Sequence, residues 1–198
     1  MPTMKEICNL GLGKIGASRV NNLTPPVSAI ENKCASEYPQ WKASELKKRR
    51  WVFATTYVRL NALPDQVPVP LDNRTYVFNT PGDMLRPIRP KNCPWVQRGQ
   101  FFYSSSNIID LEYIRNAADS ELSDAMFVDV LAARVGFECA ELVTQSPARK
   151  RDAYNYYKIC IDEAGRSNAF VLDLDQTAGD DAAYTWDTAR QQSFLSGY

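Results

Sequence analysis

The spacing of apolar residues changes twice along this chain, and this change constrains the fold more than any single motif does. In residues 1–51 and 120–166 apolar side chains recur every three or four positions, the spacing of an amphipathic helix. Between 52 and 119 the interval falls to two, and prolines separate short runs, which is typical of strands and turns. We therefore predict an α+β fold.

The order of these segments also predicts how they pack. Neither helical portion can cover its apolar stripe alone, so the helices of 1–51 and 120–166 should form one bundle. Residues 52–119 are then a small antiparallel β insertion between them. Residues 167–198 hold polar and acidic stretches with isolated aromatics, so we predict an extended C-terminal arm that orders only against a partner.

Residues Gly11–Gly16 match the G-x-G-x-x-G pattern of dinucleotide-binding loops. That loop must follow a buried strand, whereas residues 1–10 have helical spacing, and no second strand or acidic ribose ligand follows. We predict a short helix that ends near Gly16, where glycine takes the left-handed conformation of a C-cap. Gly11 and Gly13 would then let a neighbouring helix approach closely.

Caps and prolines predict where the longer helices begin and end. Thr24 should cap a helix with Pro25 at its first position, and Pro39 should kink or break this helix near Tyr38. Ser123, with Asp124 in the first turn, should cap a central buried helix over 125–143. Ser146 and Pro147 should start the next helix, which we expect to end at about 165. The apolar residues predicted to pack in these helices are Val27, Ile30, Cys34, Tyr38, Trp41, Leu46, Phe127, Val130, Leu131, Val135, Leu142, Tyr154, Tyr157, Ile161 and Ala164.

The alternation of apolar and polar residues predicts the strands, and a glycine between two such runs predicts one hairpin. Residues 52–60 should form a strand straight out of the preceding helix, and Arg98-Gly99 should form the turn of a hairpin. Residues 107–115 give the clearest strand. The residues expected to share a face in the first strand are Val52, Ala54, Thr56, Val58 and Leu60; those in the last are Ile109, Leu111 and Tyr113, opposite Asp110 and Glu112.

Composition excludes several classes of function. The chain of 198 residues has no histidine, so Ser-His-Asp and Cys-His nucleophile schemes are absent. Its five cysteines are scattered, which favours reduced, mostly buried thiols in a protein made in the cytosol. Lysine plus arginine and aspartate plus glutamate are both 23, so the net charge is zero and gives no global field for nucleic acid. We expect no membrane-spanning segment and no cofactor or metal site.

Some charged residues could support chemistry or binding. The run Lys47–Arg50 could grip phosphate, but cations in a last turn also complement the helix dipole. Glu31, Glu37 and Glu138 could in principle pair for glycoside hydrolysis. The acidic stretch 173–181 suggests a calcium loop but fails the EF-hand spacing, so a solvated acidic arm is favoured.

Opposite charges gather in two regions. Residues 84–103 contain four cations and no acid, a charge of +4, and residues 171–198 contain five aspartates and one arginine, a charge of −4. This distribution suits contact between copies or with neighbouring proteins. The candidate interface residues are Arg86, Arg89, Lys91 and Arg98 in the β insertion and Trp186, Arg190 and Phe194 in the arm, since aromatics and arginine make good anchors.

Four stretches, taken together, resemble the tail tubular protein A, or head-to-tail adaptor, family of short-tailed bacteriophages. These stretches are ICNLGLGKIGASRVNNL, ELKKRRWVFAT, LEYIRNAADSELSDAMFVDVLAARVGFECAELVTQS and YTWDTARQ. The resemblance implies a virion protein, made in the host cytoplasm and located in the tail. It would form a homo-oligomeric ring, usually a dodecamer, beneath the portal vertex. Portal protein would bind above, nozzle protein below, and DNA would pass through the channel without specific binding.

Two other functions stay open at this point. A virion-associated cell-wall hydrolase would need one specific carboxylate for muramidase activity. A protein that grips DNA through Lys47–Arg50 would lose binding steeply as salt rises. The adaptor needs neither, and it is the function that we favour.

Overall fold

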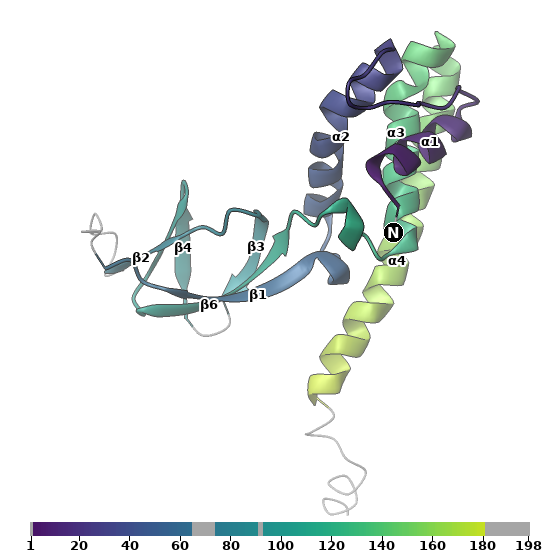
Figure 1. Cartoon of the computed structure of the whole chain (residues 1–198). Helices are drawn as coiled ribbons and strands as arrows, with labels where there is room; N and C mark the ends of the chain where they lie inside the picture. The colour runs from purple at the N-terminus through teal and green to yellow at the C-terminus, as the bar shows by residue number, and fades with distance from the viewer. Residues whose placement is uncertain (1, 65–73, 91–92, 181–198) are drawn as a thin grey trace, which may run out of the picture.

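The structure is a computed structural model that describes residues 2–64, 74–90 and 93–180, and only the backbone of 89–90 and 173–180. Over these residues the chain has an α+β fold, as predicted, with a helical bundle and two three-stranded antiparallel sheets. The α-helices are α1 (Met4–Lys14), α2 (Ala29–Lys48), α3 (Ala125–Thr144) and α4 (Pro147–Asp180). Figure 1 shows the helices side by side in one body, with the sheets beside it and α4 running on past the bundle.

Helix α1 lies against α3 and has the features that the glycine pattern predicts at two of its three glycines. Gly16 has a positive φ of 72°, as expected just beyond a helix end. Gly11 is buried at the crossing with α3, where a Cβ would lie 2.4 Å from the carbonyl oxygen of Ala132. The prediction for Gly13 was wrong, because nothing lies within 4 Å of the position its Cβ would take.

Helix α2 starts later than predicted and is not broken. Ser28, not Thr24, is the N-cap, and its side chain accepts a hydrogen bond from the backbone N–H of Glu31. Pro25, which follows a cis peptide bond, lies in the turn before the helix, since α2 begins at Ala29. Pro39 lies on the exposed side of a continuous helix, where water can satisfy the carbonyl that lacks its amide partner.

Helix α3 is the central helix, as predicted, and its inner residues are almost all buried. Its N-cap is Asp124 rather than Ser123, because the Asp124 carboxylate accepts from the backbone N–H groups of Met126 and Phe127. Leu142, which we expected to pack, is exposed near the C-terminal end of the helix.

Helix α4 is longer than predicted. It continues through Gly165, where we expected an end, to Asp180, so the first part of the predicted arm is helical. A Cβ at Gly165 would lie 1.8 Å from a guanidinium nitrogen of Arg49. The glycine therefore makes room for a crossing side chain and does not terminate the helix.

The β module consists of two sheets. One has the order β1-β6-β3, formed by β1 (Thr55–Asn61), β6 (Ile108–Arg115) and β3 (Met84–Pro90). The other has the order β2-β5-β4, formed by β2 (Tyr76–Asn79), β5 (Phe101–Ser104) and β4 (Trp95–Arg98). Phe78, Phe102 and Leu111 lie in a core of the module's own. The predicted hairpin is confirmed between β4 and β5, but its turn is Gly99-Gln100 rather than Arg98-Gly99, because Arg98 still pairs with Phe101; Gly99 has a φ of 58°.

Two details of the first sheet differ from the sequence prediction. Val52–Ala54 forms a 3-10 turn, so β1 begins at Thr55, although Thr56, Val58 and Leu60 do share its inner face. In β6, Ile109, Leu111 and Tyr113 are buried as predicted, but Glu112 on the opposite face is buried too. Its carboxylate pairs with Arg50, at the point where the bundle meets the sheet.

Trp51 joins the bundle to the β module. Its ring is fully buried, packs edge-on against Phe127 at 5.0 Å between centroids, and donates from Nε1 to the carbonyl oxygen of Glu45 at 3.0 Å. An aromatic ring at this junction couples the end of α2 to α3. The buried Trp51 ring therefore anchors the segment between α2 and β1 to α3.

Candidate functional site

Helix α4 is clamped to the junction between α2 and β1 before it leaves the bundle. The Asn168 amide donates to the carbonyl oxygen of Arg50 at 2.7 Å and accepts from the N–H of Val52 at 3.0 Å. Arg49 crosses the helix at Gly165 and reaches Asp162 at 3.1 Å. These contacts attach α4 to the body, and Figure 1 shows the helix running on past the bundle.

Large apolar side chains are exposed on the part of α4 that follows this clamp. Phe170 is 73% exposed and Val171 is 47% exposed. Three further exposed residues, Tyr154, Tyr156 and Ile159, lie earlier in the helix, and charged residues at 163 and 166 separate them from Phe170 and Val171. A pair of adjacent, exposed apolar residues on a projecting helix is a surface that a partner can cover.

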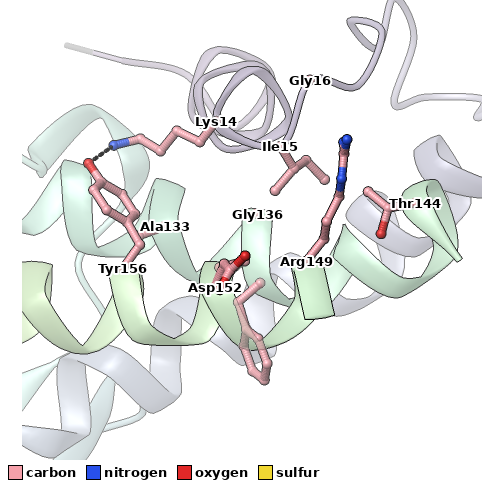
Figure 2. A pocket seen from close by; sticks show the side chains of 11 residues that line it. Lys14, Ile15, Gly16, Ala133, Gly136, Thr144, Arg149, Asp152 and Tyr156 are labelled. Atoms are coloured by element: carbon pink, nitrogen blue, oxygen red, sulfur yellow. Dashed lines mark hydrogen bonds between the residues drawn. The ribbon is translucent and has the colours of Figure 1, made fainter. Parts of the chain in front are cut away.

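A pocket of about 510 Å³ lies where α1, α3 and α4 meet. Its apolar floor includes Ala133 and Gly136 of α3, with Ile15 and Phe137 beside them. Figure 2 shows Arg149 rising from α4 at one end of the pocket and Lys14 bonded to Tyr156 at the other. A concave site of this size with a few polar groups at its rim is suited to binding one or two side chains.

The pocket is lined by the end of the glycine pattern, yet it is not a phosphate cradle. A phosphate loop presents free backbone N–H groups at the start of a helix. Here the residues lie at the end of α1, and the N–H groups of Ile15, Gly16 and Ala17 already donate to carbonyl oxygens of the helix. Lys14 donates to the Tyr156 hydroxyl at 2.8 Å and lies 3.6 Å from the Asp129 carboxylate. This arrangement supports the sequence prediction that the pattern is structural.

Three of the four cations in the run Lys47–Arg50 are used within the fold. Lys48 pairs with Glu45 at 2.7 Å, Arg49 with Asp162, and Arg50 with Glu112. A cation that pairs with a carboxylate of its own chain must give up that ion pair before it can bind a DNA phosphate. The run therefore fits a structural role better than a nucleic-acid grip.

Glu45 is a fully buried carboxylate at the meeting point of α2, α3 and α4. The Tyr157 hydroxyl lies 3.0 and 3.1 Å from its two oxygens, and Lys48 donates to the same hydroxyl at 2.5 Å. Arg134 approaches Glu45 at 3.6 Å and pairs with Glu138 at 2.5 Å. Burial raises the pKa of Tyr157. The cluster contains two cations and two carboxylates, so the buried charge of Glu45 is compensated by opposite charges close to it.

The carboxylates considered for glycoside hydrolysis each have their own partner. Glu31 accepts from backbone N–H groups at the start of α2, Glu37 pairs with Lys33, and Glu138 with Arg134. Nothing in these contacts joins two of them in one acid–base pair. Cys8, Cys34 and Cys139 are free thiols buried in the apolar core, where thiols are inert.

The predicted interface residues are only partly within the described chain. Arg86 is half-buried in β3 and Arg98 is exposed at the β4–β5 turn, so the two lie in different sheets. Arg89 pairs in register with Glu112 along the backbone. Lys91, Trp186, Arg190 and Phe194 lie outside the described residues. The exposed pair on α4 was not predicted, because we expected the helix to end before it.

Neither a known family model nor a curated protein sequence matches this chain. Among the described residues, no three Cys, Asp or Glu side chains are grouped so that they could hold a metal ion. No helix in that part of the chain is both long and apolar enough to cross a membrane.

Proposed function

We propose that this chain is a structural virion protein, a head-to-tail adaptor of a short-tailed bacteriophage. It would form a ring, of twelve copies by the resemblance, below the portal and above the tail nozzle, around the DNA channel. The observation that carries this proposal is that α4 projects beyond the bundle with Phe170 and Val171 exposed.

The geometry supports assembly because the molecule has unlike surfaces that point in different directions. A closed ring needs a heterologous interface, in which one patch on a subunit meets a different patch on the next. The projecting end of α4, the pocket beside α1 and the separate β module are three such patches. Phe170 is the best anchor among them, since a large aromatic side chain gains most when a partner buries it.

The chemistry of the described residues supports a structural role more than a catalytic one. The carboxylates named for hydrolysis are engaged with separate partners. Most of the basic run after α2 is paired inside the fold. No specific observation favours either of the two other functions.

Sedimentation with the portal protein of the same virus tests this proposal. We expect the purified chain to co-migrate with portal in a gradient, in a fixed stoichiometry, because portal templates the ring. Absence of co-migration over a range of protein and salt concentrations would contradict the adaptor function.

A substitution on α4 links that result to the proposed surface. Phe170→Asp should weaken co-migration by roughly tenfold or more, because a charge replaces an anchor that is buried on assembly. Leu10→Asp is the matched control: Leu10 is also an exposed apolar residue on a helix, but it lies on α1. Equal effects of the two substitutions would show that the end of α4 is not the contact.

A further inference from the structure

The pocket between α1, α3 and α4 has a floor and a rim of different chemistry. The floor residues are small or apolar, so the space is shaped for an apolar group. At the rim Arg149 and Asp152 lie one helical turn apart on α4. Neither forms an ion pair within the described part of the chain, whereas Lys14 is held by Tyr156 and Asp129. The free charges at this rim are therefore one guanidinium and one carboxylate.

We propose that the pocket receives residues 186–190 of a neighbouring copy of this chain. This segment reads WDTAR and lies beyond the described residues. The Trp186 indole would enter the apolar space, because a pocket of about 510 Å³ has room for it. Asp187 would pair with Arg149, and Arg190 with Asp152, so each rim charge meets its opposite.

Chain geometry requires the segment to come from another copy. Asp152 lies 28 positions before Asp180 in α4, which at about 1.5 Å per residue is roughly 42 Å along the helix axis. Trp186 follows Asp180 by only six residues, which span at most about 22 Å when fully extended. The Trp186 side chain of the same molecule cannot reach its own pocket while α4 stays helical to Asp180.

Docking between copies makes the contact heterologous, since the segment of one subunit meets the pocket of the next. Such contacts repeat from copy to copy and close into a ring when the rotation allows it. This docking proposal rests on the proposed function in one respect, because both require that copies of this chain lie next to one another. It names which part of one copy binds which part of another, without involving portal.

Peptide binding tests the proposal on the full chain. The protein carries Trp186→Ala, so that its own segment does not compete, and a fluorescent peptide of residues 181–198 is titrated by anisotropy. We expect saturable binding, reduced about 30-fold by Trp186→Ala in the peptide. Arg149→Glu in the protein should weaken binding roughly tenfold. Arg151→Glu is the matched control, because it removes an exposed cation of the same helix that does not line the pocket.

A charge exchange separates specific pairing from general electrostatics. The peptide with Asp187→Arg should bind the Arg149→Glu protein more tightly than the unchanged peptide does. No binding, equal losses for Arg149→Glu and Arg151→Glu, or no recovery in the exchanged pair would each overturn the proposal. Because no portal is present, these results do not decide the adaptor function. Co-migration with portal alongside a failed peptide experiment would remove this inference alone.

Discussion

Glu31 shows how a single side chain can organise the segment before a helix. Its carboxylate accepts four backbone hydrogen bonds at 2.9–3.1 Å, from the N–H groups of Asn21, Asn22, Val27 and Ser28. These bonds favour the charged form and lower the pKa of Glu31 to about 2, from an ordinary value of 4.5. This carboxylate holds the segment between α1 and α2 together with Asn9, whose amide donates to the carbonyl oxygen of Val20 and accepts from its N–H.

The lowered pKa predicts how stability depends on pH. A carboxyl group whose pKa is lower in the folded state contributes stability above its unfolded pKa, and this contribution is lost as pH falls through the folded pKa. We therefore expect the free energy of unfolding to fall between about pH 4.5 and pH 2. Glu31→Gln should reduce stability at pH 7 and flatten this slope, as measured by urea unfolding at several pH values. Glu37→Gln, also in α2, should leave the slope nearly unchanged; equal slopes in wild type and Glu31→Gln would contradict the account.

At the scale of whole elements, the contact between α1 and α3 depends on two glycines that face each other, Gly11 of α1 and Gly136 of α3. A methyl group at Gly11 would meet Ala132 and Val135 of α3 at less than 3 Å, so the helices must separate to admit it. Gly11→Ala should destabilise the protein by about 1–3 kcal/mol, the usual cost of overpacking. Gly13→Ala is the matched control in the same helix, with open space around it. It should stabilise by up to about 1 kcal/mol through helix propensity. Chemical denaturation of the two variants measures both effects, and a similar sign for both would rule out the close approach.

The clamp at Asn168 predicts how firmly α4 is attached. Asn168→Ala leaves one part-buried carbonyl and one part-buried N–H without their partner, and the cost of losing such a partner is about 1–3 kcal/mol for a fully buried group. We expect a loss of about 2 kcal/mol or more, with faster hydrogen exchange in α4 after 168. Ser167→Ala, an exposed neighbour, should do neither. Unchanged exchange in Asn168→Ala would show that other contacts hold the helix.

Local rules predicted the elements whose signals are local. Gly16 ends α1 and Gly99 turns a hairpin because each needs a positive φ that glycine adopts readily. The predictions failed where the local structure depends on a residue that is distant in the sequence. Gly165 looks like a helix end in the sequence, but it lies inside α4, at a place where Arg49 crosses close to the helix. The glycine leaves room for Arg49. These two residues are far apart in the chain, so no local sequence pattern can predict their contact.

The candidate site was less predictable than the fold for the same reason. The sequence drew attention to Trp186 and to the cations of the β insertion, but it missed the exposed pair Phe170 and Val171. Their exposure follows from the point at which α4 leaves the bundle, and the bonds of Asn168 to Arg50 and Val52 and the Arg49–Asp162 pair lie just before that point. An amide in a helix carries no sequence signal for such a role.

At the scale of the molecule, the chain is a bundle and a β module joined at Trp51, with one helix extending beyond both, as Figure 1 shows. The two bodies have separate cores, so each can present a surface without disturbing the other. A ring subunit needs such surfaces toward its two neighbours and toward the components above and below.

Electron cryomicroscopy of the protein mixed with its portal is the most direct test of the central claim. The adaptor proposal predicts a closed ring of this chain on the portal, with Phe170 and Val171 buried against another subunit. A map in which the chain is absent from the portal, or in which it is bound with both side chains facing solvent, would contradict it.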